Sequence, residues 1–337
     1  MTRVLIADDS PTCRSLLASI LGASGMTVVG EARDGEEAVS MTRGLRPEVV
    51  IMDVNMPMLD GFEATRRIMV ETPTPIVVVS GCVDTRDVVV TMRALDAGAL
   101  VAVPKPRGPG APTFAEEARA FADTVRLMAQ VKVVRRFAAR HRPQVTPVPR
   151  EDARPTVIAV GASTGGPGAL KRLLSALPAA LPPILVVQHI AAGFVDGFAA
   201  WLQSAAGRPV EVARHGATLH RGTVYVAPDG AHLGVARGAV ELSEAPPIGG
   251  FRPSATHLFQ SVARASGSAV VAVVLTGMGH DGLDGLRAVR EAGGRVFAQD
   301  AESCVVFGMP GAAVDAGLAE AVLPPEAIGR RIAQLVT

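Results

Sequence analysis

The sequence predicts an α/β protein made of two doubly wound parallel-sheet domains joined by a linker. Short continuous apolar runs, typical of strands buried on both faces, alternate with segments of helical periodicity in both halves of the 337-residue chain. Between the halves, the stretch PQVTPVPREDARP has four prolines in thirteen residues, which is a linker composition. We therefore assign residues 1–125 and 155–337 to the two domains and residues 126–154 to a helical, proline-rich linker.

In the N-terminal domain, strand-like and helical segments alternate five times, from RVLIAD to ALVAVPKP. Such alternation indicates a parallel sheet that is covered by helices on both faces. The predicted strands cover residues 3–8, 26–32, 48–53, 75–81 and 99–106. The predicted helices cover residues 11–24, 35–46 and 60–71, a segment between the last two strands, and residues 114–142, where basic residues collect toward the end.

Polar residues stand at the carboxyl ends of these predicted strands, which meet at one edge of a parallel sheet. Three carboxylates gathered there repel one another unless a hard cation such as Mg²⁺ joins them. A lysine and a hydroxyl beside them suit an incoming phosphoryl group, which one carboxylate, Asp53, would accept covalently. The set comprises Asp8, Asp9, Asp53, Asn55, Ser80 and Lys105.

The motifs ADDS, DVNMPMLDG, VVVSG and PKP resemble those of the receiver domain of two-component response regulators, which has a flavodoxin-like fold. The resemblance implies that Asp9 and Asp53 bind Mg²⁺ directly, together with the backbone carbonyl of Asn55, and that Asp8 acts through water. It also implies that Asp53 is phosphorylated and that two further side chains contact the phosphoryl group. These are Ser80 and Lys105. Many receivers carry an aromatic residue three positions before the lysine, where this chain has Ala102, so the usual aromatic switch is absent.

The C-terminal domain begins with TVIAVGASTGGPGALKRLL, which reads as a buried strand, a glycine-rich turn and a helix. The turn lacks the lysine of a phosphate-binding P-loop, and it matches the loose nucleophile pattern G-x-S-x-G at Ser163. Two more predicted strands end in polar residues: PPILVVQHI ends near His189, and AVVAVVLTGMGHDG leads to Asp281. Taken singly, the histidine is better explained as a buried core residue and the aspartate as a turn or helix-cap residue.

Together, Ser163, His189 and Asp281 have the chemistry of a hydrolase. A serine hydroxyl needs a base, a histidine can supply one, and a carboxylate fixes its tautomer and steadies its charge. The chain order Ser–His–Asp differs from the Ser–Asp–His order of α/β-hydrolases, so a separate fold is predicted.

The motifs GASTGGPGAL, VVQHI, RPSATHLFQSVA, VVLTGMGHDGLDGL and AQDAESCVVFGMP resemble the catalytic domain of the chemotaxis protein-glutamate methylesterases, the CheB family, from about Thr156 to the end. The resemblance implies a Rossmann-like domain in which Ser163 is the nucleophile, His189 the general base and acid, and Asp281 the orienting carboxylate. It further implies that the Met278 N–H helps to form an oxyanion hole and that Thr164 is a second contact near the nucleophile.

The same resemblance implies the substrates and partners. The expected reactions are hydrolysis of glutamyl methyl esters and deamidation of glutamines on the cytoplasmic helices of methyl-accepting chemoreceptors, without a cofactor. The expected phosphodonor is a chemotaxis-type histidine kinase, and phosphorylation of Asp53 is expected to uncover the active site. The segment from Ala191 to Trp201 departs from the family pattern and is expected to border the substrate groove. Cys304 stands where serine is frequent, and we expect a small buried residue there.

Composition excludes other classes of protein. The 33 lysine and arginine residues nearly balance the 32 aspartate and glutamate residues, so we expect no nucleic-acid partner. Neither a signal-peptide pattern nor an apolar run of about 18 residues is found, so we expect a cytoplasmic protein without direct membrane insertion. The three cysteines lie far apart without a CxxC pair, so no zinc site or disulfide framework is predicted.

Two other functions compete with the esterase. A phosphorylation-responsive transcription regulator would need a DNA-reading module, and the C-terminal half offers no basic recognition helix. The alternative is a receiver-gated regulator or scaffold of a non-motility chemosensory pathway, with an altered or lost esterase substrate. The presence of all three residues of the Ser–His–Asp set argues against a lost site.

Overall fold

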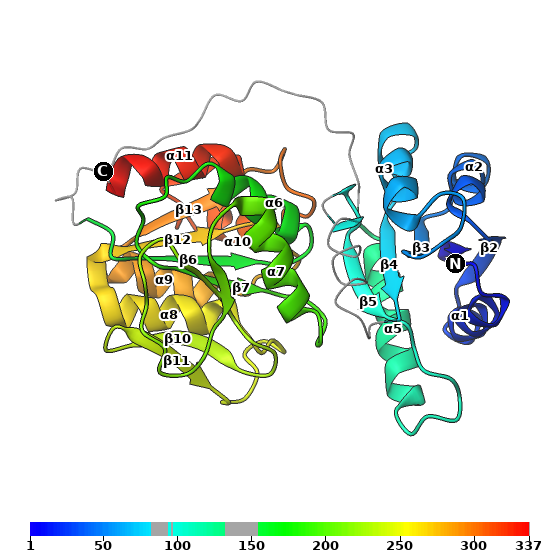
Figure 1. Cartoon of the computed structure of the whole chain (residues 1–337), viewed down its shortest axis with the longest axis horizontal. Coiled ribbons are helices and arrows are strands. Elements are labelled where there is room, and N and C mark those ends of the chain that lie inside the picture. Colours follow the sequence, from blue (N-terminus) through cyan, green and yellow to red (C-terminus); the bar gives the residue numbers. More distant parts are fainter. Residues whose placement is uncertain (82–93, 96, 132–153, 337) are drawn as a thin grey trace. The chain divides into compact units, whose positions relative to one another are not determined.

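The computed structural model describes residues 1–81, 94–95, 97–131 and 154–336. The chain divides into two compact units, Met1–Arg135 and Arg136–Thr337, and each is described by itself. Both units contain a parallel sheet with helices packed against it, which confirms the predicted fold class (Figure 1). Within the described residues, no helix is both long enough and apolar enough to cross a membrane.

The first unit has a five-stranded sheet in the order β2-β1-β3-β4-β5, and every neighbouring pair is parallel. Its strands are β1 (Arg3–Ala7), β2 (Thr27–Ala32), β3 (Val49–Asp53), β4 (Ile76–Ser80) and β5 (Val101–Pro104). Its helices are α1 (Pro11–Ala23), α2 (Gly35–Leu45), α3 (Gly61–Glu71) and α5 (Phe114–Met128). The helix predicted between the last two strands falls largely on residues outside the described ranges.

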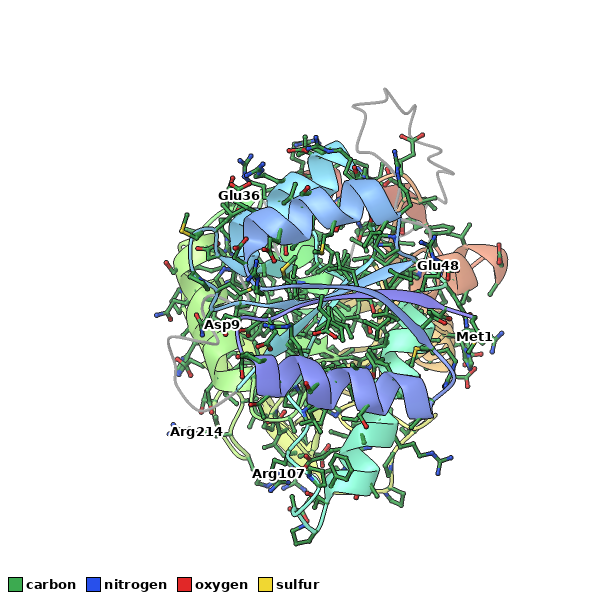
Figure 2. The ribbon with its side chains drawn as sticks, turned by 90° about the vertical axis from the view of Figure 1, so that its right-hand side faces the viewer. Met1, Asp9, Glu36, Glu48, Arg107 and Arg214 are labelled. Atoms are coloured by element: carbon green, nitrogen blue, oxygen red, sulfur yellow. The ribbon has the colours of Figure 1, made fainter. Side chains whose placement is uncertain are left out.

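Local sequence explains these elements. Every residue of β3 and β4 is buried, because helices cover both faces of the sheet. Three helices begin at a side chain that accepts a hydrogen bond from the first turn, namely Ser10, Asp34 and Asp60. Figure 2 shows α2 and α3 on one face of the sheet and α1 and α5 on the other, with Asp9 at the opposite end of β1 from Met1.

The closing helix α5 is shorter than predicted, because it ends at Met128 rather than continuing toward residue 142. The following N–H groups of Gln130 and Val131 bond to carbonyls only three residues back, which tightens the last turn and ends the helix. The rest of the predicted helix and the proline-rich linker fall on residues 132–153, which lie outside the described ranges.

The second unit has a seven-stranded parallel sheet in the order β14-β13-β12-β6-β7-β9-β8 and an antiparallel hairpin, β10–β11. The strands are β6 (Val157–Ala162), β7 (Ile184–Gln188), β8 (Val210–Val212), β9 (Val224–Val226), β10 (His232–Ala236), β11 (Ala239–Ser243), β12 (Val270–Val274), β13 (Arg295–Gln299) and β14 (Ala321–Leu323). The helices are α6 (Gly166–Ser175), α7 (Val195–Ala206), α8 (Ala255–Ser266), α9 (Leu283–Glu291), α10 (Met309–Asp315) and α11 (Pro325–Val336), with a short 3₁₀ turn at Gly267–Ala269.

Strand β6 is the centre of this sheet, because the chain continues to β7 on one side and returns to β12 on the other. Helices α6 and α11 lie on one side of the sheet and α8 and α9 on the other (Figure 1). The crevice at such a change of direction is where open α/β sheets place their ligands. The topology therefore points to the end of β6 as the functional edge.

Phe259 of α8 joins the helices of one face to the centre of the sheet. Its ring is fully buried, and three glycines make room for it: a Cβ added at Gly161, Gly282 or Gly285 would lie 3.1, 3.0 or 2.6 Å from an atom of Phe259. These glycines belong to β6, to the turn before α9 and to α9. Phe259 is thus one of the contacts that hold α8 and α9 against β6.

Replacing Phe259 by alanine is expected to lower the free energy of unfolding of the second unit by about 3–5 kcal/mol, because a large cavity would be left under β6. Trp201 is the single tryptophan of the chain and is buried in this unit, so denaturant unfolding followed by its fluorescence measures the effect. The milder Phe259→Leu change serves as the control and should cost clearly less. Equal losses for the two variants would contradict the cavity explanation.

Candidate active site

Three strand ends bring the predicted catalytic residues to one edge of the second sheet. Ser163 follows β6, His189 follows β7, and Asp281 lies in the turn between β12 and α9. The backbone joins these segments directly, since the His189 N–H donates to the Ala162 carbonyl at 2.9 Å. The Ser163 N–H likewise donates to the Thr276 carbonyl at 3.0 Å. Adjacent parallel strands therefore place side chains that are far apart in sequence within one site.

The turn that carries Ser163 is tight, and its glycines are required by close approach. Gly165 has a φ of +77°. A Cβ on Gly166 would lie 1.9 Å from the Gln188 Oε1 atom. The Gln188 Nε2 group donates to the carbonyls of both Ser163 and His189, each at 2.8 Å. The side chain at the end of β7 thus holds the Ser163 turn and the His189 backbone at a constant spacing.

Asp281 is buried and receives hydrogen bonds from four groups. Its Oδ2 atom accepts from His189 Nε2 at 2.9 Å and from the Ala255 N–H at 2.7 Å. Its Oδ1 atom accepts from the Ser254 hydroxyl at 2.7 Å and from the Thr256 N–H at 3.1 Å. Three of these donors belong to the N-terminal end of α8, where the helix dipole also favours a negative charge. The N-terminal end of α8 is therefore the binding site for this carboxylate.

Burial by itself would raise the pKa of Asp281, but the hydrogen bonds from His189 and Ser254 outweigh it and hold the pKa below its usual range. Asp281 is therefore ionised and can only accept hydrogen bonds, so the proton of a neutral imidazole resides on His189 Nε2. The His189 Nδ1 atom then carries the free lone pair. Within the described residues it is buried and has no hydrogen-bond partner.

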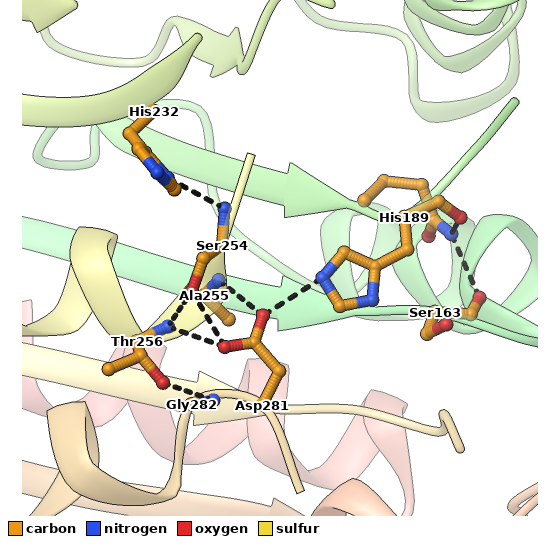
Figure 3. Close-up of polar contacts among 9 residues, drawn as sticks. Ser163, His189, His232, Ser254, Ala255, Thr256, Asp281 and Gly282 are labelled. Atoms are coloured by element: carbon orange, nitrogen blue, oxygen red, sulfur yellow. Dashed lines mark hydrogen bonds and ion pairs between the residues drawn. The ribbon is translucent and has the colours of Figure 1, made fainter. Parts of the chain in front are cut away.

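Ser163 lies on the side of the imidazole away from Asp281 (Figure 3). No hydrogen bond joins the Ser163 hydroxyl to His189 among the described residues. Catalytic contacts of this kind are commonly long without substrate and shorten in the bound complex. The structure thus brings His189 and Asp281 into direct contact, with Ser163 on the other side of the ring (Figure 3).

Behind the nucleophile, Thr276 ties three loops together. Its hydroxyl lies 2.9 Å from the Thr164 carbonyl and accepts hydrogen bonds from the N–H groups of Val305 and Val306 at 3.1 and 3.0 Å. The next residue, Gly277, leaves no room for a side chain, since a Cβ there would lie 2.7 Å from the Ser163 Cβ. The predicted oxyanion and nucleophile contacts, Met278 and Thr164, both flank this junction.

Met278 is partly exposed in the turn after β12. Within the described part of the chain, its N–H meets no hydrogen-bond acceptor, whereas the neighbouring Gly277 N–H donates to the Val306 carbonyl at 3.0 Å. An N–H group of this kind, beside the nucleophile, is available to a developing oxyanion.

Sequence reasoning missed the residues that support Asp281. Ser254, at the start of α8, and Thr256 both bind the carboxylate or its turn, since the Thr256 hydroxyl accepts from the Gly282 N–H at 2.8 Å. The fully buried His232 accepts the Ser254 N–H at its Nδ1 atom and pairs through Nε2 with the Pro246 carbonyl. A serine just before a helical segment, in RPSATHLF, is a recognisable cap signal. The carboxylate that it would bind is distant in sequence.

Two segments singled out from the sequence are placed as follows. The segment from Ala191 to Trp201 forms a loop and the start of α7, and its Gly193 N–H donates to the Asp229 carboxylate at 2.7 Å. Cys304 is buried as expected, and burial raises the pKa of its thiol to about 12. An unreactive, structural cysteine follows from that environment.

In the first unit, the strand ends gather the predicted acidic residues. One carboxylate oxygen from each of Asp8, Asp9 and Asp53 lies within 4.8 Å of the others. Lys105 Nζ lies 2.8 Å from Asp8 Oδ2 and 3.1 Å from Asp53 Oδ1. The Ser80 hydroxyl is buried and without a partner among the described residues. Asn55 lies exposed just after β3. All six predicted residues thus lie at the carboxyl ends of the strands.

Burial raises the pKa of Asp53 from 3.8 to about 6; the charge of Lys105 opposes this rise and that of Asp8 adds to it. The negative charge at this edge is therefore incompletely compensated by Lys105. Three oxygen donors with excess negative charge are the donor set that a hard divalent cation such as Mg²⁺ prefers. The residues present accordingly fit such an ion.

Comparison with known proteins matches both units to families. Residues 158–332 match the family model "CheB methylesterase", and residues 4–111 match the "Response regulator receiver domain". The chain belongs to the CheB methylesterase family. Its sheet edge with Ser163, His189 and Asp281 is thus the candidate active site of a methylesterase domain, and its acidic cluster lies in a receiver domain.

Named relatives span almost the whole of this CheB-family chain. A protein-glutamate methylesterase/protein-glutamine glutaminase of Anaeromyxobacter dehalogenans is 54% identical over 99% of this chain and 98% of its own length. One of Myxococcus xanthus is 56% identical over 95% of this chain and 93% of its own length. The crystal structure of the Thermotoga maritima CheB methylesterase catalytic domain is 38% identical, with a TM-score of 0.52, over 55% of this chain and 100% of that one.

The raised pKa of Asp53 predicts a pH-dependent stability of the receiver unit when Mg²⁺ is absent. Between pH 3.8 and about 6 the folded state binds more protons than the unfolded state, so stability falls as the pH rises through this window. Asp53→Asn should therefore stabilise the unit at pH 7 by roughly 1–3 kcal/mol, with a gain that vanishes near pH 4. Hydrogen exchange of the β3 amides measures the effect. The exposed Asp123→Asn is the control, and a wild-type unit that gains stability from pH 4 to 6 would contradict the prediction.

The Ser254 hydroxyl is expected to support catalysis through Asp281. Ser254→Ala removes a hydrogen bond to a charged group, and we expect the kcat of the CheB esterase reaction to fall by about tenfold with KM unchanged. Ser261→Ala is the matched control, because among the described residues the hydrogen bonds of that buried serine of the same helix go to the Val235 backbone. A similar loss of kcat in both variants would indicate a general disturbance of α8.

Proposed function

We propose that this CheB-family chain is a phosphorylation-activated protein-glutamate methylesterase and protein-glutamine glutaminase that acts on methyl-accepting chemoreceptors. The proposed domains are a receiver at residues 1–125, a linker at 126–154 and a catalytic domain at 155–337. The observation that carries the proposal is the pair formed by His189 and an ionised Asp281, with the free Nδ1 atom on the side of Ser163. The names of the relatives support the choice of substrate.

In the first step, the Ser163 Oγ atom attacks the side-chain carbonyl of a glutamyl methyl ester while His189 Nδ1 accepts the hydroxyl proton. The resulting oxyanion receives a hydrogen bond from the Met278 N–H, with Thr164 as a second contact. Asp281 stabilises the imidazolium through Nε2. The bond from carbon to the methoxy oxygen then breaks, and His189 gives its proton to that oxygen, so methanol leaves and an acyl-Ser163 ester remains.

In the second step, His189 Nδ1 removes a proton from water, whose oxygen attacks the acyl carbonyl. The bond to Ser163 Oγ breaks, the serine regains its proton from His189, and a glutamate carboxyl is released. A glutamine amide enters the same sequence and loses ammonia in place of methanol. Both reactions use protons and side chains of this chain, and no cofactor takes part in them.

The receiver is proposed to control this chemistry. Asp53 accepts the phosphoryl group from a chemotaxis-type histidine kinase, and Lys105 and Ser80 contact it. Asp9, Asp53 and the Asn55 carbonyl would hold Mg²⁺ directly, with Asp8 acting through water, and the ion would neutralise charge during transfer. Phosphorylation shifts the population toward an uncovered active site, without an aromatic switch because position 102 is alanine. We place the protein in the cytoplasm, where receptor helices and kinase meet.

Methanol release from receptor membranes that carry labelled glutamyl methyl esters tests both parts. Wild type should release methanol and should do so faster with acetyl phosphate and Mg²⁺. Ser163→Ala should release none above background, a loss of at least ~10³-fold. Asp53→Ala should keep a basal rate that the phosphodonor does not raise.

Other outcomes would change the assignment. Wild-type protein that is phosphorylated on Asp53 but releases no methanol from several receptor sets would favour a receiver-gated regulator or scaffold of a non-motility pathway. In that case the departures between Ala191 and Trp201 would mark an altered substrate site. Activity that persists in Ser163→Ala would overturn the proposed nucleophile.

A further inference from the structure

We propose that Phe251 is a positioning residue for the catalytic base: it holds the His189 ring in its working plane and stabilises its protonated form. The inference rests on the proposed role of His189 in the Ser163 mechanism. The two rings are stacked, with centroids 4.1 Å apart and planes 5° from parallel. Phe251 thus covers one face of an imidazole whose Nε2 atom bonds to Asp281 and whose Nδ1 atom is on the side of Ser163 (Figure 3).

The exposure of Phe251 is unusual for its unit. Within the described residues of the second unit, the exposed large apolar side chains are Phe251 and Phe307, at 36% and 38%. The imidazole beneath Phe251 is only 10% exposed on its side chain. An aromatic ring that stays partly in water while it covers a base gains less from burial than a core residue does. Burial by itself therefore accounts poorly for an aromatic residue at position 251, whereas the contact with His189 accounts for it.

A single hydrogen bond does not determine the orientation of an imidazole. The bond from Nε2 to Asp281 restrains the ring, but a hydrogen bond accepts a range of angles, and the torsion about the bond from Cβ to the ring is broad for histidine. A flat neighbour against the ring face removes that freedom. With Asp281 at one edge and Phe251 on one face, the Nδ1 lone pair has one direction left, which is the side of Ser163 (Figure 3).

The loop that carries Phe251 is rigidly built. Ile248 and Phe251 exchange two backbone hydrogen bonds of 3.1 and 3.0 Å across Gly249 and Gly250, whose φ angles of +59° and +89° suit a two-residue hairpin turn. On the other side of Phe251, the Arg252 guanidinium donates to the Glu244 carbonyl at 3.0 Å. The chain on both sides of Phe251 is therefore held by hydrogen bonds, which fixes the position from which the ring extends.

The same loop is connected to the carboxylate through one buried residue. His232 pairs through Nε2 with the Pro246 carbonyl in this loop, and its Nδ1 atom accepts the N–H of Ser254. Ser254 in turn donates to Asp281. His232 thus ties the element that covers the imidazole to the element that holds its carboxylate, so both contacts of the base share one support.

The stack also has an electrostatic consequence. The face of a phenylalanine ring carries negative charge density and attracts a cation above it. His189 becomes a cation when it accepts the Ser163 proton, so Phe251 interacts more strongly with the transition state than with the resting state. Leucine would retain apolar bulk but not this attraction, whereas tyrosine would retain both. The two substitutions therefore separate the proposed role from simple packing.

The test measures the rate at which a small fluorophosphonate phosphonylates Ser163, with fluoride as the leaving group. It also measures the kcat and KM for methanol release from receptor membranes. In Phe251→Leu, we expect the fluorophosphonate rate and kcat to fall by about tenfold with KM changed less than about twofold. In Phe251→Tyr, both rates should stay within about threefold of wild type. Phe114→Leu makes the same exchange at a partly buried position of the receiver unit. It is the control for a loss of rate that any phenylalanine-to-leucine change would cause.

Each contrary result is informative. A raised KM with an unchanged fluorophosphonate rate would make Phe251 a receptor contact and overturn the proposal. Equal losses of rate in the leucine and tyrosine variants would mean that Phe251 acts through packing alone and would overturn the proposal. If Phe251→Leu also has a lower thermal midpoint, a near-normal rate in Phe251→Tyr would show that the aromatic face is what catalysis needs. If wild type releases no methanol but its Ser163 reacts, the proposed function fails while the role of Phe251 is still measured. An unreactive wild-type Ser163 overturns both.

Discussion

The catalytic unit depends on one buried negative charge. Asp281 is taken out of water, and four donors compensate its charge, three of them from the start of α8. Burying such a charge without these partners would cost several kcal/mol. The tautomer of His189 follows from this carboxylate, and the N-terminal end of α8 is joined to it by three hydrogen bonds.

The receiver unit treats its buried charge in the opposite way. Asp53 is as buried as Asp281, but its main partner is Lys105, which it shares with Asp8. Its pKa is therefore raised to about 6 by burial, although Lys105 opposes the rise. A carboxylate that is fully hydrogen-bonded can orient a neighbour, whereas an under-compensated cluster of carboxylates suits a divalent cation. The same strand-end position thus holds a fully hydrogen-bonded carboxylate, Asp281, in one sheet and an under-compensated carboxylate, Asp53, in the other.

Close backbone approach is the second constraint on the catalytic edge. Glycines at positions 166 and 277 allow the nucleophile turn to lie against Gln188 and the loop after β12. A Cβ at position 166 would collide with Gln188, and one at position 277 would collide with Ser163, so either would shift the segments that meet at this edge. The small residues of GASTGG and LTGMG are therefore required for close packing at this edge, and not for backbone flexibility.

Much of this protein could be predicted from its sequence. Continuous apolar runs identified the strands of the receiver to within two residues, and four of the five predicted strand ends carried the polar residues that the structure places there. Such patterns are local, because a parallel strand buried on both faces needs an apolar run and a turn after it. The same logic identified Ser163, His189 and Asp281 as residues of one edge.

Tertiary structure alone decided the support of those residues. The hydrogen bonds from Ser254 to Asp281, the stack of Phe251 on His189, and the link through His232 join segments whose spacing carries no periodic signal. The early end of α5 was also not readable, because helical periodicity continues past it. Sequence by itself determined which elements form and which chemistry stands at their ends, since these depend on local pattern. Which groups surround each charge depends on how distant segments pack, and only the folded chain decides that.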